Sequence, residues 1–252
     1  MKKILNNEEL ASTQVKLMYS EFYLGKNLNH PSLIEYKYFF RKYDEGSKEH
    51  EFHIIMDLME GGDLENYLSE NGRPYLIDTI QEIGAQIVAG IKYLHDNDII
   101  HQDLKPQNIL FNGEFTQIKL IDLGISHRLL DETRKTVSAE KGTPRYMSPE
   151  QVDGKLSFKI DVWALGCVLM QFATGLMPFH KINNDMAVGL EIYRGMTPLE
   201  YIYKHAEPDQ LDMIEDHEDF QALLRLCFER NYSKRPSASD LMDHQFWAHY
   251  TE

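Results

Sequence analysis

The amino-acid sequence predicts an α+β protein of two lobes, in which a small mixed lobe precedes a larger and mainly helical one. Residues 51–59, EFHIIMDLM, are short, apolar and bounded by charge, which is typical of a buried strand. The next residues, EGGDL (60–64), should end that strand. Apolar residues beyond this point recur mostly at helical spacing. We therefore expect lobes of residues 1–59 and 60–252, with a cleft between them as the usual place for a ligand.

The small lobe should contain one helix ahead of this strand. Val15, Met18 and Phe22 stand at helical spacing, and Leu24 and Leu28 are candidates for the same face. The spacing predicts a helix over this segment.

The large lobe should be organised around two helices. The first runs through residue 95, because apolar side chains form one stripe along it, and the second, DVWALGCVLMQFAT (161–174), is apolar nearly all round and should be buried. The stripe consists of Ile80, Ile83, Ile87, Ile91 and Leu94. Between the two helices, Asn112-Gly113 separates two short apolar runs, which predicts a pair of strands joined by a turn.

The composition excludes several classes of protein. The chain has 252 residues, 42% of them hydrophobic, and a formal net charge of −14, so we expect a folded core and neither nucleic acid nor an anionic membrane as the main partner. Cys167 and Cys227 lie far apart in apolar stretches, which fits a reducing compartment better than a disulfide framework. No segment has the ~20 apolar residues of a membrane span. We expect a soluble, cytoplasmic protein; the oligomeric state stays open.

The segment HQDLKPQN (101–108) contains groups that phosphoryl transfer requires. Such a reaction needs a carboxylate at the attacking hydroxyl, oxygen ligands for magnesium and a cation at the transferring group. The segment offers such groups in the order Asp103, Lys105 and Asn108. A second carboxylate, Asp122, follows a predicted strand. Each fragment alone is weak, because a single loop Asp is more often a cap.

Five segments together resemble those of eukaryotic-type serine/threonine protein kinases, over essentially the whole chain. The loop HQDLKPQN resembles the catalytic loop H-R-D-L-K-x-x-N, and DLG (122–124) resembles the metal-binding D-F-G. The other three segments are GTPRYMSPE (142–150), DVWALG (161–166) and KRPSASDLMDHQFW (234–247), which resemble the segment ending in A-P-E, the start of the central helix and the C-terminal end. The resemblance implies a bilobal kinase fold.

The resemblance also implies ATP and Mg²⁺ as cofactors and Ser or Thr hydroxyls of proteins as substrates. Asp103 would act as the base-like residue, and Lys105 would lie near the transferring phosphate. Asn108 and Asp122 would bind magnesium. Lys105 itself is typical of the serine/threonine type, and Thr143 agrees with this.

Other residues would support the site without touching the phosphate. His101 would pack against the DLG segment, and Asp161 would tie the catalytic loop to the central helix. Glu150 would pair with Arg235 and brace the substrate-facing loop.

The resemblance places the adenine pocket at the end of the predicted buried strand. Met56 would lie at the back of the pocket, and the backbone of Asp57 and Met59 would hydrogen-bond adenine. Asp63 would reach the ribose, and Leu110 would pack under the base. Met56 and Leu110 can also be ordinary core residues.

The match is weaker at the start of the chain. MKKI resembles the end of the strand that carries the phosphate-binding Lys, which would be Lys2, and its glutamate partner would be Glu21. A Lys at position 2 can equally be a solvated terminal charge. The two strands of the G-x-G-x-x-G loop have no counterpart, since the first glycine is Gly25. We expect that upstream strands are missing from the sequence; the alternative is a pseudokinase or scaffold with weak ATP turnover.

Three positions depart from the kinase pattern. Gly25 stands where the family has a bulky apolar residue, which predicts a gap and costs about 1 kcal/mol of helix propensity. Leu123 replaces the Phe of D-F-G, a conservative change. Gln102 replaces an Arg that pairs with a phosphorylated residue in most kinases, so we expect its loss to affect regulation and not chemistry.

Regulation and substrate choice are only partly readable. Thr133, Thr136 and Ser138 are possible phosphorylation sites; the alternative is that they belong to an ordinary polar surface loop. Gln107 and Gln171 stand where arginine-directed kinases often have Glu, so a strict arginine requirement is not expected. Ile125, after DLG, indicates threonine over serine as the acceptor, a further implication of the resemblance.

Overall fold

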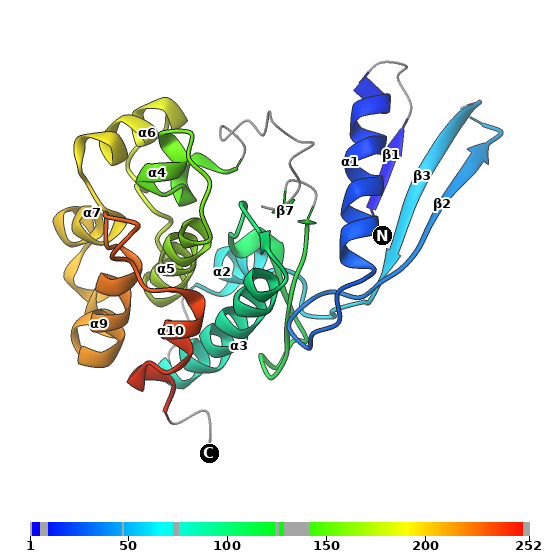
Figure 1. The fold of residues 1–252 in the computed structure, drawn as a ribbon. Helices are drawn as coiled ribbons and strands as arrows, with labels where there is room; N and C mark the ends of the chain where they lie inside the picture. Colours follow the sequence, from blue (N-terminus) through cyan, green and yellow to red (C-terminus); the bar gives the residue numbers. More distant parts are fainter. Residues whose placement is uncertain are drawn as a thin grey trace.

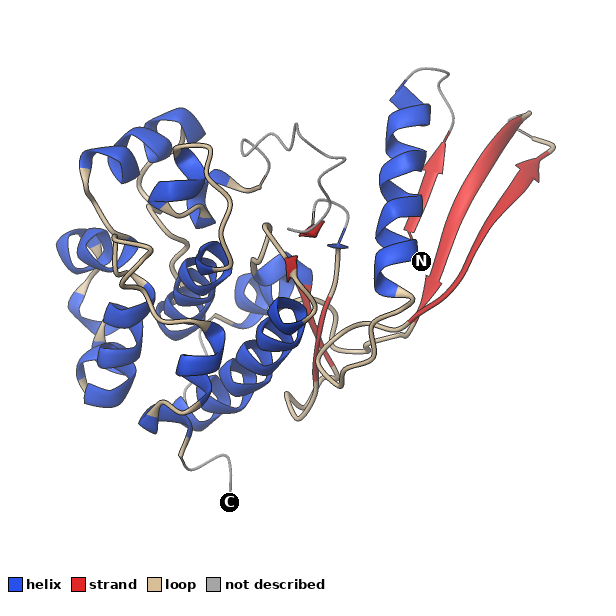
Figure 2. Cartoon of the chain, in the orientation of Figure 1, coloured by secondary structure: helices blue, strands red, loops and turns tan. Residues whose placement is uncertain are grey.

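The computed structural model describes residues 2–5, 10–46, 48–72, 76–123, 126–128 and 142–248, with only the backbone described at residues 2–5, 10–13, 49, 127 and 128. Thr133, Thr136, Ser138 and Ile125 lie outside the described residues. The chain forms two lobes, as the sequence predicted (Figure 1). Strands dominate the first lobe and helices the second (Figure 2).

The small lobe is a three-stranded antiparallel sheet covered by one helix. The strands are β1 (Lys2–Leu5), β2 (Tyr36–Asp44) and β3 (Glu49–Met56), in the order β1-β3-β2. Helix α1 (Leu10–Gly25) lies along the sheet (Figure 1). Phe22 on the helix packs on Phe39 of β2 with ring centroids 5.8 Å apart, so the face of the helix that contains Phe22 contacts the sheet.

Two of the predicted element ends differ from the structure. The strand expected over 51–59 begins earlier and ends at Met56, because the chain turns there and Asp57 donates its N–H to the Glu35 carbonyl (3.2 Å). Helix α1 ends at Gly25, so Leu28 lies beyond it. Its N–H donates to the Gly25 carbonyl at 3.1 Å in the turn that follows.

The large lobe is built on α3 (Ile77–Asp96) and α5 (Lys159–Thr174). All five residues of the predicted stripe on α3 are at most 1% exposed. Every residue of α5 from Ile160 to Thr174 is buried, as its apolar sequence predicted. The remaining helices are α2 (Leu64–Asn71), α4 (Pro149–Val152), α6 (Asp185–Arg194), α7 (Pro198–His205), α8 (Asp212–Glu215), α9 (Glu218–Cys227) and α10 (Ala238–Met242).

Short strands and 3-10 turns connect the larger elements. Strands β5 (Ile109–Phe111) and β6 (Ile118–Leu120) form the predicted antiparallel pair, joined by a loop that begins at Asn112-Gly113. Strand β4 (Ile99–Ile100) pairs with β7 (His127–Arg128). The 3-10 turns are η1 (Pro106–Asn108), η3 (Pro144–Tyr146), η4 (Pro208–Gln210) and η5 (Gln245–Trp247).

Backbone hydrogen bonds join the lobes. Leu120 of β6 donates its N–H to the Ser32 carbonyl at 2.8 Å, and its own carbonyl accepts from the N–H of Ile34 at 3.1 Å. The segment between α1 and β2 is thereby fixed to the large lobe. Both cysteines are buried thiols without a disulfide, as expected. Among the described residues, no helix is long and apolar enough to cross a membrane.

Candidate active site

The loop between β4 and η1 is held by a buried carboxylate from the central helix. Asp161 accepts hydrogen bonds from the backbone N–H groups of His101 (2.8 Å) and Gln102 (2.9 Å). It also contacts His95 Nε2 at 2.9 Å and is fully buried. Burial raises the pKa of Asp161, but the hydrogen bond and charge of His95 outweigh it, so the pKa lies below its ordinary value. The loop is therefore anchored to α5 by a charged group.

Gln102 has an unusual conformation in this loop. Its φ of 70° lies in the left-handed region, which a non-glycine residue adopts only when its surroundings hold it there. The backbone N–H of Gln102 donates to Asp161, and its backbone carbonyl accepts a hydrogen bond from Gln151 Nε2 at 3.2 Å. The side-chain amide is buried, and neither of its polar atoms has a hydrogen-bond partner within the part of the chain that the structure describes. Gln102 is therefore fixed through its backbone.

The Asp103 carboxylate lies at the centre of a closed polar network. Its Oδ2 contacts Lys105 Nζ at 2.8 Å, and its Oδ1 accepts from the Thr143 hydroxyl at 2.8 Å. Lys105 Nζ also donates to Thr143 Oγ1 at 2.8 Å, so the three side chains form a triangle. The side chains of Asp103 and Lys105 are 15% and 21% exposed, so solvent or a ligand can reach them. The structure thus brings Asp103 and Lys105 together.

Asn108 and Asp122 provide hard oxygen donors next to this network. Asn108 Nδ2 donates to the Asp103 carbonyl at 2.8 Å and to Asp103 Oδ2 at 3.2 Å, which orients the amide and leaves its oxygen as a ligand atom. Asp122 follows β6 with φ 64°, and the carbonyl before it, of Ile121, contacts His101 Nε2 at 3.1 Å. One amide oxygen and one carboxylate fit the ligand preference of Mg²⁺, which usually keeps several waters and substrate phosphates as its other ligands.

A buried ion pair braces the segment that contains Thr143. Arg235 donates to both carboxylate oxygens of Glu150, at 2.6 and 3.0 Å, and to the carbonyls of Lys159 and Glu229, both at 2.8 Å. Its guanidinium also lies 5.0 Å from the centre of the Trp163 ring. This network joins α4, α5 and the segment before α10, as expected for Glu150 and Arg235.

The chain matches a family model described as "Protein kinase domain" over residues 1–247. The chain belongs to the protein kinase family. Relatives include mitogen-activated protein kinase kinase kinase 3 of Arabidopsis thaliana, which is 29% identical over 97% of this chain and 37% of the relative. Human mitogen-activated protein kinase kinase kinase 5 is 33% identical over 91% of this chain and 16% of its own length. Mouse serine/threonine-protein kinase Nek1 is 33% identical over 88% of this chain and 17% of its own length.

The kinase chain thus spans only a part of these relatives, from 16% to 37% of their length. The segments on which the sequence resemblance rested contain the catalytic loop, the two oxygen donors and the buried ion pair.

The residues predicted for the adenine pocket lie together at the junction of the lobes. Met56 ends β3, and the Asp57 carboxylate pairs with Lys37 at 2.6 Å. Leu110 of β5 forms an antiparallel bridge with Asp63, and Met59 is buried in the core. An adenine site at these residues stays a prediction.

Asp63 has a structural role in addition. Its carboxylate caps α2 by accepting from the N–H of Asn66 (2.9 Å) and from Asn66 Nδ2 (2.6 Å). Such caps contribute about 1 kcal/mol. A contact from Asp63 to a ribose stays a prediction.

Lys2 and Glu21 lie on neighbouring elements of the small lobe. Lys2 stands opposite Ile54 in the sheet, and its side chain is outside the description, so its pairing with Glu21 stays a prediction. Glu21 is 2% exposed and accepts a hydrogen bond from the Tyr36 hydroxyl at 3.0 Å. The predicted gap at Gly25 is wrong, because a Cβ there would lie 2.4 Å from two atoms of the Tyr36 ring.

Sequence reasoning missed another chain of contacts in the kinase domain. Gln171 on α5 accepts from the Tyr146 hydroxyl at 2.5 Å and donates to Glu65 Oε2 at 2.9 Å. Burial and the charge of Glu65 raise the pKa of Tyr146, so its hydroxyl stays a donor. Tyr146 follows Thr143 by one turn. Nothing in the sequence around Glu65 indicated this contact, because Gln171 is 106 residues away.

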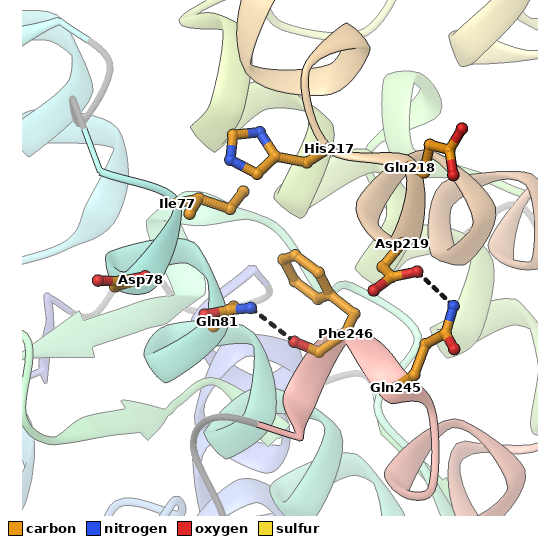
Figure 3. A pocket seen from close by; sticks show the side chains of 8 residues that line it. All are labelled: Ile77, Asp78, Gln81, His217, Glu218, Asp219, Gln245 and Phe246. Atoms are coloured by element: carbon orange, nitrogen blue, oxygen red, sulfur yellow. Dashed lines mark hydrogen bonds between the residues drawn. The ribbon is translucent and has the colours of Figure 1, made fainter.

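A separate pocket of about 320 Å³ lies near the C-terminal end of the chain (Figure 3). None of the residues predicted for ATP, magnesium or catalysis lines it. Its polar groups are partly used internally, since Gln81 Nε2 donates to the Phe246 carbonyl at 2.8 Å and Gln245 donates to Asp219. The lining residues are Ile77, Asp78, Gln81, His217, Glu218, Asp219, Gln245 and Phe246.

Proposed function

We propose that this protein transfers the γ-phosphoryl group of ATP to serine or threonine hydroxyls of proteins. The observation that carries the proposal is the triangle of Asp103, Lys105 and Thr143, to which the Asn108 amide is bonded. Ile121, the residue before Asp122, donates its N–H to the Asn108 carbonyl at 3.0 Å. The relatives named above include serine/threonine kinases, which supports the same class of acceptor. The presence of all five groups is the reason to prefer a catalyst over a scaffold, which has no chemical need for them.

In this mechanism Asp103 orients the acceptor hydroxyl and takes its proton as the oxygen attacks the γ-phosphorus and the bond to ADP breaks. Lys105, which already neutralises Asp103 in the structure, would place its ammonium group near the transferring phosphoryl oxygens. Thr143 holds the carboxylate in place through its hydroxyl.

Asn108 and Asp122 would hold magnesium through one amide oxygen and one carboxylate. Bound magnesium supplies positive charge that neutralises the phosphate oxygens. The anchoring of Asn108 to Asp103 keeps its amide oriented for this purpose. The nucleotide pocket would be formed by Met56, Asp57, Met59, Asp63 and Leu110. Lys2, paired with Glu21, would contact the phosphates of the nucleotide.

The test is phosphorylation of a generic protein substrate by the purified chain with Mg²⁺ and ATP, followed by analysis of the phosphorylated amino acids. We expect phosphoserine or phosphothreonine and a complete loss of signal with EDTA. Asp122→Asn should lower the rate by at least about 100-fold, the usual loss on removal of one group that stabilises transition-state charge.

The matched control is Asp209→Asn, which removes an exposed carboxylate elsewhere in the large lobe and should leave the rate unchanged. An Asp122→Asn variant as active as this control would refute the metal site, and phosphotyrosine as the main product would refute the acceptor class.

A further inference from the structure

Tyr36, the first residue of β2, lies between two elements of the candidate site. Its side chain is 4% exposed, and its hydroxyl donates to Glu21 Oε1 on α1 at 3.0 Å. A tyrosine at the start of a strand is ordinarily a core residue. A buried hydroxyl must find a partner, and here the partner is the carboxylate that the kinase resemblance assigns to the phosphate-binding Lys.

Gly25 makes room for this tyrosine. A Cβ at residue 25 would lie 2.4 Å from Cδ2 and Cε2 and 3.2 Å from Cγ of the Tyr36 ring, so the face of the ring occupies the space of the missing side chain. Gly25 is not among the described residues with positive φ, so its backbone does not require glycine. The requirement at this position is therefore space, and the two residues fit each other.

A second carboxylate acts on the same hydroxyl. Burial raises the pKa of Tyr36 well above its ordinary value, and the charges of Glu21 and then Asp122 raise it further, while a backbone contact from Leu123 opposes this. The Tyr36 hydroxyl therefore remains a donor to the Glu21 carboxylate of α1.

We propose that Tyr36 and Gly25 form a matched pair in which the Tyr36 hydroxyl positions Glu21 and couples α1 to β2. The bulky apolar residue that the family has at position 25 would connect these elements by packing alone. In this chain the contact is made from β2 by a hydrogen bond. Tyr36 is thus a positioning residue that acts through Glu21, and its effect on activity rests on the proposed function.

The fit of the pair is tested by unfolding the full chain, which requires no activity. Gly25→Leu should lower the midpoint temperature by roughly 5 °C or more, because overpacking a core is costly. Adding Tyr36→Leu to this variant should recover most of the loss, since the smaller side chain frees the space. A Gly25→Leu variant as stable as the unmodified chain, or a double variant less stable than Gly25→Leu alone, would overturn the matched pair.

The positioning role is tested by Tyr36→Phe, which retains the ring and removes the hydroxyl. We expect kcat/KM for ATP to fall at least about tenfold, the effect of losing one hydrogen bond to a charged group. The matched control is Tyr38→Phe on the same strand, whose side chain is 68% exposed and whose rate should not change.

A double-variant cycle distinguishes positioning from general stability. If Tyr36 acts through Glu21, Tyr36→Phe should have no further effect on kcat/KM in a Glu21→Gln background; independent, multiplying losses would overturn the proposal. An increase in rate for Tyr36→Phe would overturn it too, since the hydroxyl would then restrain Glu21. Absence of phosphoryl transfer by the unmodified chain would refute the proposed function. The same cycle would then be measured by the free energy of unfolding in denaturant, where additive effects of the two substitutions would again reject the coupling.

Discussion

Asp161 shows how one buried residue determines the shape of the catalytic loop. Its carboxylate accepts hydrogen bonds from two consecutive backbone N–H groups, and one of these belongs to Gln102, whose φ is positive. The strained backbone of Gln102 is therefore stabilised by a charge from α5. A substitution at residue 161 should release the loop without touching the reacting groups.

Asp161→Asn should lower the free energy of unfolding by about 3–5 kcal/mol at pH 7, because it breaks a buried charged contact. The pKa of Asp161 is lowered below 3.8 in the folded state, so its contribution is present above about pH 4 and lost as the pH falls through the folded pKa. Urea unfolding at pH 7 and pH 3 should therefore show a smaller difference between variant and parent at pH 3.

Asp96→Asn removes an exposed carboxylate that pairs with Lys92 and should change stability by less than 1 kcal/mol. An equal effect of both variants at pH 7 would show that Asp161 does not hold the loop.

At the residue scale, the sequence was informative where a residue type and its spacing reflect chemistry. Asp103, Lys105 and Asn108 are near neighbours in the chain, and the structure places them in one network. Gly25 was misread because the filling group, Tyr36, comes from another element, and no local pattern predicts which side chain enters a space left by a glycine.

At the element scale, α2, α5 and η3 meet through Glu65, Gln171 and Tyr146. The sequence predicted no strict requirement for arginine in substrates, because Gln107 and Gln171 stand where arginine-directed kinases often have Glu. The structure adds a carboxylate to this position, since Glu65 of α2 is bonded to Gln171. A negative charge thus lies two hydrogen bonds from Tyr146, one turn after the residue that contacts Asp103.

We therefore expect a moderate preference for a basic residue near the phosphorylated Ser or Thr. Peptides with Arg or Lys at one position should react about fivefold faster than those with Ala, as expected for a partly exposed ion pair. Glu65→Gln should remove most of this preference in a peptide array.

The control is Glu70→Gln on the same helix, where the residue is exposed and the charge change is identical. A preference that both variants retain would show that Glu65 has no part in substrate choice.

The types of the main elements were predictable, whereas their ends were less so. The stripe on α3 and the apolar sequence of α5 are direct signatures of burial, and both helices have the expected place in the core. The strand at 51–59 was drawn too far because apolar residues continue past Met56, where a backbone bond from Asp57 to Glu35 turns the chain. Such a bond between segments leaves no trace in local composition.

At the scale of the whole molecule, the two lobes meet where the predicted site residues lie. Backbone bonds at Leu120 fix the linker before β2 to the large lobe, and Asp122 follows two residues later. Tyr36, at the start of β2, contacts Glu21 on α1. The fold class was predictable because hydrophobic periodicity changes between the lobes; the way the lobes are joined was not, since it depends on pairs distant in sequence.

The central claim is that Asp103 makes this arrangement a catalyst, and Asp103→Asn tests it most directly. This variant retains the shape of the side chain and the contacts of its Oδ1, but it cannot accept the proton of the attacking hydroxyl. We predict that the rate of phosphoryl transfer from Mg²⁺-ATP to protein falls by at least about 100-fold, while Asp216→Asn, which changes an exposed carboxylate, leaves it unchanged. Equal rates for the parent and for Asp103→Asn would contradict the account.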